Sequence, residues 1–298
     1  MRITESRFAS DFLYNVNNSQ QRINEYQNQL SSGLRVNEPS DDPEAADLIL
    51  RLNTSLSRNE QFTSNIGSAQ SMLSTTTDAL DGVQQIIGQL QTTMTQAANG
   101  AQASTIPSFA DTVDGYISQV LAQANTQFNG KYVFGGTQTQ TPPYVLTPNA
   151  APPPSETVTF NGNAGTISYA VAEGQTQQVN VSGQEAFNGT ALLDEMIKIR
   201  DNLKAGIVPT AADETAVQNS LNTLLSASGR AGTVLQGLDT TAAHLQAQHT
   251  QLLSLRSAQQ DTDVAAATLN LKQEQTTLDA ALAIGAKILP LSLTDFLT

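Results

Sequence analysis

Two long segments of this chain carry the same seam of small and apolar side chains, spaced by alternating steps of three and four residues. This alternation is typical of helices that pack along their length as coiled coils. The first seam comprises Ile66, Ala69, Leu73, Thr76, Leu80, Val83, Ile87, Leu90, Met94 and Ala97. The second comprises Val217, Leu221, Leu224, Ser228, Ala231, Leu235, Leu238, Ala242, Leu245, His249 and Leu252. We therefore expect two long helices, far apart in the sequence, that are each other's packing partners.

Start and stop signals define two helices in the first third of the chain. Apolar side chains recur with nearly helical spacing over residues 8–30, and Gly33 suits the left-handed position that ends a helix. Asp42 before Pro43 predicts an N-cap followed by proline at the first helical position. The second helix, which carries the first seam, is expected to run from there to about Asn99.

A third helix and a strand-like region follow. The sequence predicts a helix over residues 107–128 that ends at the Asn-Gly pair after it. Over residues 132–189, proline, glycine and β-branched residues replace the helical period. The runs 157–160 and 166–169 flank an Asn-Gly turn and predict a β-hairpin. A small β-rich domain is therefore expected within a helical protein.

The expected fold class is mainly α with a small inserted β-rich domain, and with long N- and C-terminal helices paired in a coiled-coil rod. Three parts are expected: terminal helices in residues 1–42 and 260–298, a helical rod in residues 43–135 and 190–259, and the inserted domain in residues 136–189. A fold that closes by pairing its own ends suits a structural building block better than an enzyme, which normally needs a concave pocket.

Composition excludes several classes of partner. With 14 basic and 27 acidic residues the formal net charge is −13, which argues against nucleic acid, because phosphates select clustered lysine and arginine. The same sign disfavours an anionic membrane surface, and no stretch approaches the ~18 consecutive apolar residues of a membrane-spanning helix. Because there is no cysteine, disulfides and thiolate chemistry are excluded. The N-terminus lacks the pattern of a cleavable secretion signal, which leaves export by another route open.

The titratable residues do not converge on a catalytic or metal site. The two histidines, His244 and His249, are five positions apart on one expected helix and so point about 140° apart. Aspartates at positions 41–42 and at 261 and 263 lie beside expected helix starts, where capping explains them. We therefore expect no catalytic residues, no metal site and no cofactor.

Four segments carry a more specific pattern. They are Met1-Arg2-Ile3-Thr4; Gln29-Leu30-Ser31-Ser32-Gly33 with Pro39-Ser40-Asp41-Asp42-Pro43; Phe134-Gly135-Gly136-Thr137 followed by Thr141-Pro142-Pro143-Tyr144; and Ala286-Lys287-Ile288-Leu289-Pro290-Leu291-Ser292-Leu293 with Asp295-Phe296-Leu297. The first two resemble the bacterial flagellin superfamily as a whole, and the last two resemble its flagellar hook-associated junction proteins. The resemblance covers both ends of the chain and weakens over residues 150–189.

This resemblance implies a structural component of the bacterial flagellum that forms the adaptor ring at the hook–filament junction, on which the filament assembles. It implies an extracellular location, reached through the flagellar type III export apparatus. The implied partners are like subunits, the preceding hook-associated protein, flagellin or other filament-side subunits, and an export chaperone. The terminal helices would line the inner tube, and the β-rich domain would face outward.

The resemblance also assigns a role to the apolar stripes of the terminal helices, namely burial between neighbouring subunits. The expected assembly interface comprises Phe8, Phe12, Val16, Ile23, Leu30, Leu271, Leu278, Leu282, Leu289, Leu293 and Phe296. Gly285 falls on the same C-terminal stripe, where a missing side chain would let a neighbouring helix approach closely.

Two other interpretations remain open at this point. The chain could be a minor flagellin, which is a filament subunit rather than an adaptor. It could also be a secreted coiled-coil effector or adhesin that binds a ligand through its β-rich domain. An enzyme is the weakest alternative, because no nucleophile, base and orienting group converge in the sequence.

Overall fold

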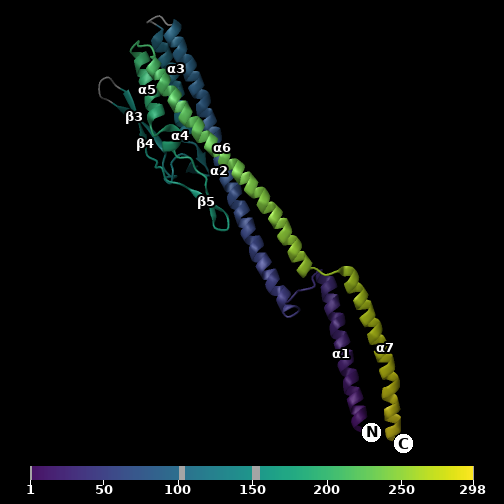
Figure 1. The fold of residues 1–298 in the computed structure, drawn as a ribbon. Helices are drawn as coiled ribbons and strands as arrows, with labels where there is room; N and C mark the ends of the chain where they lie inside the picture. Colours follow the sequence, from purple (N-terminus) through teal and green to yellow (C-terminus); the bar gives the residue numbers. More distant parts are fainter. Residues whose placement is uncertain (1, 101–104, 150–154, 298) are drawn as a thin grey trace. The chain divides into compact units, whose positions relative to one another are not determined.

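The structure, a computed structural model, describes residues 2–100, 105–149 and 155–297 (Figure 1). The helices are α1 (Arg2–Ser32), α2 (Pro43–Gly100), α3 (Ile106–Ala124), α4 (Gly183–Phe187), α5 (Ala191–Lys204), α6 (Ala211–Gln260) and α7 (Val264–Leu297). The strands are β1 (Gln127–Phe128), β2 (Lys131–Tyr132), β3 (Tyr144–Asn149), β4 (Ser155–Phe160), β5 (Ser168–Ala172) and β6 (Gln175–Gln178). Contacts group the chain into a terminal unit, residues 1–58 and 248–298, and a central unit, residues 59–247.

The terminal unit pairs the two ends of the chain. Helices α1 and α7 lie side by side and antiparallel, so that the start of α1 is next to the end of α7 (Figure 1). Gly33 has a φ of 74° and ends α1, as predicted. Asp42 accepts a hydrogen bond from the Ala45 backbone N–H (3.0 Å), and Asp263 accepts one from the Ala265 N–H (2.9 Å). Both carboxylates therefore cap helices, α2 and α7 respectively, which confirms the predicted capping for these two. The prediction is wrong for the other two aspartates, because Asp41 accepts from backbone N–H groups of its own loop and Asp261 accepts from the Ser257 hydroxyl.

The first seam forms the middle of the core of the central unit. All of its members, from Ile66 to Ala97 on α2, are buried. On α6 every seventh residue from Val217 to Leu245 is buried, and the other members of the second seam are half-buried. The fully buried ones are Val217, Leu224, Ala231, Leu238 and Leu245. Apolar side chains of α3 and α5 belong to the same cluster, and α2 contributes more buried side chains to it than α6 does. The predicted coiled-coil spacing is thus confirmed as a burial pattern.

The strands form three separate antiparallel hairpins, β1–β2, β3–β4 and β5–β6. They share their core with the helices, since Tyr144, Val158, Val171 and Val179 belong to the same hydrophobic cluster as the α2 seam. The β-rich part is therefore built into the central unit. These contacts divide the chain at other residues than the expected three-part division, which stays a prediction.

A buried arginine ties the β3–β4 hairpin to the helices. Arg200 on α5 donates hydrogen bonds to Asp114 on α3 (2.9 Å), to Asp201 beside it (2.9 Å) and to Glu156 on β4. Burial disfavours the charged form, but the three carboxylates outweigh this and raise the pKa of Arg200 above its ordinary value. The hairpin is thus held by charge as well as by apolar packing.

The predicted strand pairing is wrong. Residues 157–160 do not pair with residues 166–169; instead β4 pairs with β3, and β5 pairs with β6. The sequence hides β3 because Pro148 lies inside it, within a stretch that otherwise reads as a proline-rich connection. Proline is tolerated there because a two-stranded ribbon consists only of edge strands.

The predicted end of the third helix is also wrong. Helix α3 ends at Ala124, and the Asn-Gly pair at 129–130 lies further on, in the turn between β1 and β2. Asn129 and Gly130 have φ values of 50° and 73°, the left-handed conformation that a two-residue hairpin turn requires. The Asn-Gly pair is a hairpin signal here and not a helix stop.

Helix α6 begins at a capped and charged position. The backbone N–H and the hydroxyl of Thr210 donate to Asp213 Oδ2 (2.8 and 2.7 Å), and Lys198 Nζ donates to Asp213 Oδ1 (2.8 Å). Burial opposes ionisation, yet these hydrogen bonds hold the pKa of Asp213 well below its usual range. The middle of α5 is therefore joined to the start of α6 by an ion pair.

Replacing Asp213 with asparagine is expected to lower the free energy of unfolding by about 1–3 kcal/mol at pH 7, because charge-assisted hydrogen bonds are lost. A carboxylate with a lowered folded-state pKa stabilises the fold above its unfolded pKa, about 3.9, and loses this effect as the pH falls through the folded-state value. The difference between Asp213→Asn and the parent should therefore shrink in acid.

Urea unfolding followed by circular dichroism, at pH 7 and below about pH 3, measures this difference. The matched control is Glu214→Gln, which removes an exposed carboxylate from the same helical turn and should change stability by no more than about 0.5 kcal/mol. An Asp213→Asn deficit of equal size at both pH values would contradict the assignment.

Candidate assembly interface

The predicted assembly residues lie mostly on the facing sides of α1 and α7. Ile23 is buried between the helices. Five more are half-buried: Phe12, Val16, Leu30, Leu271 and Leu278. Leu282 is 47% exposed, and so lies largely outside the seam. The side chains of Phe8, Leu289, Leu293 and Phe296 lie outside the described residues. Contact of any of these residues with a neighbouring subunit stays a prediction.

The ring of Phe12 occupies a notch in α7 that Gly285 creates. A Cβ atom at position 285 would overlap the outer edge of the Phe12 ring, so any side chain there would force the ring to move. The glycine predicted to allow close approach of a helix thus accommodates one aromatic ring. This contact fixes the position of the N-terminal half of α1 along α7.

A charged cluster missed by the sequence analysis joins the middle of the two helices. Arg22 donates to both carboxylate oxygens of Glu274, from Nε to Oε1 (2.9 Å) and from Nη2 to Oε2 (3.0 Å). The buried Ser19 hydroxyl donates to Glu274 Oε2 and accepts from Arg22 Nη2, both at 3.2 Å. The Arg22 guanidinium holds the pKa of Glu274 below its usual range. This arrangement is the two-pronged arginine–carboxylate pair, the most directional of the common ion pairs.

The inner ends of α1 and α7 are joined by backbone hydrogen bonds. Leu34 and Asp261 form an antiparallel β-bridge, and Thr262 N–H donates to the Gly33 carbonyl (3.0 Å). The Arg35 side chain donates to the Gln259 carbonyl (2.9 Å) and to Asp42 (3.0 Å). The end of α1 and the start of α7 are therefore held together.

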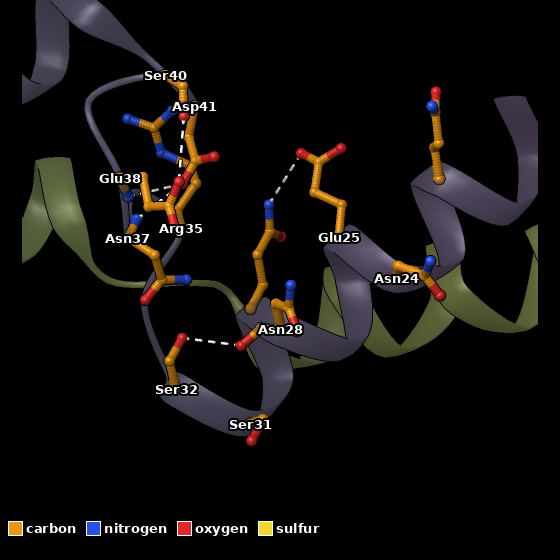
Figure 2. Close-up of a pocket in the computed structure, with 12 residues that line it drawn as sticks. Asn24, Glu25, Asn28, Ser31, Ser32, Arg35, Asn37, Glu38, Ser40 and Asp41 are labelled. Carbon is orange, nitrogen blue, oxygen red and sulfur yellow. Dashed lines mark hydrogen bonds between the residues drawn. The ribbon is translucent and has the colours of Figure 1, made fainter.

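A polar groove of 780 Å³ lies beside this junction, between the last turns of α1 and the loop that follows (Figure 2). Four amide side chains of α1 line it: Gln21, Asn24, Asn28 and Gln29. The loop contributes Asp41, whose carboxylate accepts from the Asn37 and Glu38 backbone N–H groups (3.0 and 2.9 Å). The Asp41 carboxylate therefore stabilises the backbone conformation of the loop. Across the described ranges of the chain, no group of three or more His, Cys, Asp and Glu side chains is placed to hold a metal ion.

Exposed and buried apolar side chains are divided unequally between the units. In the described part of the chain, 46 apolar side chains are buried, of which seven belong to the terminal unit. Thirteen large apolar side chains are exposed, and nine of these belong to the terminal unit. On α1 and α7 these include Leu13, Tyr14, Val264, Leu269 and Ile284. The terminal unit therefore has a thin core and an apolar surface.

The N-terminal part of the chain resembles one class of protein. Residues 3–139 match the bacterial flagellin N-terminal helical region. This match covers the N-terminal part of the chain, which is therefore similar to flagellins.

Over a longer stretch the chain is similar to flagellar hook-associated protein 3. The protein of that name from Escherichia coli (strain K12) is 28% identical over 266 residues, which span 78% of this chain and 81% of the relative. Flagellin 1 of Proteus mirabilis is 26% identical over 200 residues, which span 62% of this chain and 53% of the relative.

The fold agrees with that of a solved relative. A flagellar hook-associated protein from Vibrio parahaemolyticus superposes with a TM-score of 0.65 at 21% identity, covering 74% of this chain and 100% of that chain. A mainly helical fold with a small β-rich part is therefore shared. Among the helices of the described residues, none has the length and apolar character needed to cross a membrane.

Proposed function

We propose that this chain is a structural subunit of the bacterial flagellum and forms the adaptor at the hook–filament junction, with no catalytic activity. The similarity to hook-associated protein 3 over about four-fifths of both chains supports this assignment. The observation that carries it is the thin core and apolar surface of the terminal unit, in which Leu13, Tyr14, Leu269 and Ile284 are exposed.

Assembly is the process that best accounts for this surface. A soluble protein rarely exposes many large apolar side chains on one unit unless that unit meets a partner. At about 25 cal/mol per Å² of buried apolar surface, covering these side chains against neighbouring helices would stabilise the terminal pair substantially. Like subunits arranged in a ring are the proposed partners, with the eleven predicted interface residues at or near the contact.

The further partners follow from the position of an adaptor. One end of the ring would contact the preceding hook-associated protein, and the other would contact flagellin or another filament-side subunit. We place the protein in the extracellular part of the flagellum, delivered by the type III apparatus with the help of an export chaperone. No nucleic acid and no inserted membrane segment is part of this proposal.

Deletion of the gene is expected to leave hooks without filaments and to release unpolymerised flagellin into the medium. Electron microscopy of the mutant cells, together with an assay of flagellin in the culture supernatant, measures both effects. Expression of the intact chain from a plasmid should restore the filaments. Ordinary filaments on the hooks of the deletion strain would contradict the adaptor function.

A minor flagellin is the second candidate, supported by the similarity to Flagellin 1 of Proteus mirabilis. The two candidates differ in what the purified chain does alone. A filament subunit would polymerise into long filaments when seeded, whereas an adaptor would stop after a short assembly. Negative-stain electron microscopy of the seeded protein distinguishes them.

A further inference from the structure

The apolar contact between α1 and α7 does not by itself define how the helices align. Among the side chains of this pair that the structure describes, Ile23 on α1 and Ala267 on α7 are the only buried apolar ones, and most other seam residues are half-buried. Half-buried seams of similar side chains tolerate sliding by a turn or a heptad, because comparable apolar groups meet in each alignment. Something more specific is needed to choose one alignment.

Two contacts on the pair cannot be reproduced after sliding. The Phe12 ring fits α7 only where a glycine stands, at Gly285. Ten residues further along α1, Arg22 meets Glu274, which lies eleven residues back along the antiparallel α7. At about 1.5 Å per residue these spacings correspond to about 15 and 16.5 Å, so a single alignment satisfies both contacts.

We propose that Arg22 and Glu274, together with the Phe12–Gly285 notch, are the specificity-determining residues that select the partner helix of α1 and its register. The recognised feature is a helix that carries a carboxylate and a glycine eleven positions apart. Helix α7 of the same chain provides it, and a helix without this pair of features is rejected. The proposal deepens the proposed function, because it states how the terminal helices of a junction subunit pair correctly before or during assembly.

The sequence around the ion pair supports a role in selection. Sliding α7 by one heptad would place Ala267 or Ala281 opposite Arg22, and would place Glu274 opposite Asn15 or Gln29. None of these can replace the charge that is lost. The nearest other acidic residue on α7, Asp279, lies five positions away and about 140° around the helix.

The exposure of the pair indicates specificity more than stability. The side chains of Arg22 and Glu274 are 45% and 21% exposed, and ion pairs at such positions contribute little to stability on average. Misplaced or like charges between helices are nevertheless unfavourable, and this is how flanking charges determine partner choice in coiled coils. The two-pronged arginine–carboxylate contact also requires a defined orientation of both side chains, and Ser19 hydrogen-bonds to each of them, which makes the choice of partner more specific.

A charge-reversal cycle on the full-length chain tests the inference. The variants are Arg22→Glu, Glu274→Arg and the double reversal, studied by hydrogen–deuterium exchange of peptides from α1 and α7. Each single reversal turns an attraction into a repulsion, so it should lower amide protection in both helices about tenfold. The double reversal should restore most of the lost amide protection. Added salt should reduce the loss caused by each single reversal, because salt screens electrostatic interactions.

The matched control is the double reversal of Arg51 and Asp47, an exposed ion pair within α2 that joins no second helix. It should leave the exchange of α1 and α7 unchanged. The proposal would be overturned if the double reversal lowered the amide protection of α1 and α7 by as much as the two single reversals added together. So would single reversals without effect, or a parent chain whose terminal helices show no protection.

Filament formation in a deletion strain provides the second readout and separates the two proposals. Single reversals should support few filaments, and the double reversal should support many. If the parent chain itself does not restore filaments, the adaptor function is wrong, but the exchange experiment still decides whether Arg22 and Glu274 select the pairing.

Discussion

Replacing Tyr144 with alanine is expected to lower the free energy of unfolding of the central unit by about 3–5 kcal/mol, the cost typical of removing a large aromatic ring from a core. The Tyr144 side chain is 1% exposed at the start of β3. Its ring lies 5.0 Å from that of Phe160 and 5.6 Å from that of Phe187, and its hydroxyl donates to the Gly189 carbonyl (3.0 Å). Burial raises the pKa of the Tyr144 phenol, so the hydroxyl stays a donor over the usual pH range.

The matched control for this prediction is Tyr144→Phe, which keeps the ring and removes only the hydroxyl. It should cost about 1–2 kcal/mol, because the Gly189 carbonyl loses its partner while the aromatic packing remains. Urea unfolding followed by circular dichroism measures both variants. If Tyr144→Ala lowers the free energy of unfolding by no more than Tyr144→Phe does, the aromatic cluster does not hold the β-rich part to the helices.

The long helices could be predicted because their burial is periodic and local. All ten members of the first seam, Ile66 to Ala97, are buried in α2, and helix ends at Gly33 and Asp42 follow from capping chemistry that involves only adjacent residues. Such signals need no knowledge of distant segments. The coiled-coil pattern therefore determines most of the architecture in advance.

Strand pairing could not be predicted, because it depends on contacts between segments and not on local preference. The partner of β4 is β3, which contains Pro148 and reads as a connection until Tyr144 is seen to be a core residue. Asn125 further fixes β3, since its side-chain amide exchanges two hydrogen bonds with the backbone of Tyr144 (2.8 and 3.0 Å). Such a pair of hydrogen bonds from a side chain to a distant backbone leaves no periodic pattern in the sequence.

The interface was predictable only in its apolar part. Periodic spacing found Phe12 and Ile23, and it marked Gly285 as a point of close approach, although not which side chain would use it. It could not find Arg22 and Glu274, because 252 residues separate them and a charged residue beside a seam normally faces solvent. One signal is that the polar Ser19 stands at a seam position of α1 where an apolar side chain would be expected, and Arg22 lies on the same side of the helix three residues later.

Replacing Phe12 with aspartate is expected to abolish filament formation while the central unit keeps its stability. The ring would be replaced by a carboxylate facing Gly285, where no cation is available among the described contacts and where an unpaired charge is costly to bury. The central unit should be unaffected, since Phe12 belongs to the terminal unit and not to the core cluster around α2. The fraction of hooks that carry filaments, counted by electron microscopy, and swimming in soft agar measure the loss.

Two controls make the Phe12→Asp result specific. Asn17→Asp adds the same charge to an exposed position on another face of α1, and it should leave filaments intact. Phe12→Leu keeps an apolar group against Gly285 and should retain partial function, because part of the apolar contact survives.

Thermal unfolding of the purified variants must show an unchanged main transition, since a destabilised central unit would give the same loss of filaments for another reason. Swimming cells with normal filaments in the Phe12→Asp strain would show that the seam between α1 and α7 is not needed for assembly, and the adaptor would then have to contact its neighbours through other surfaces.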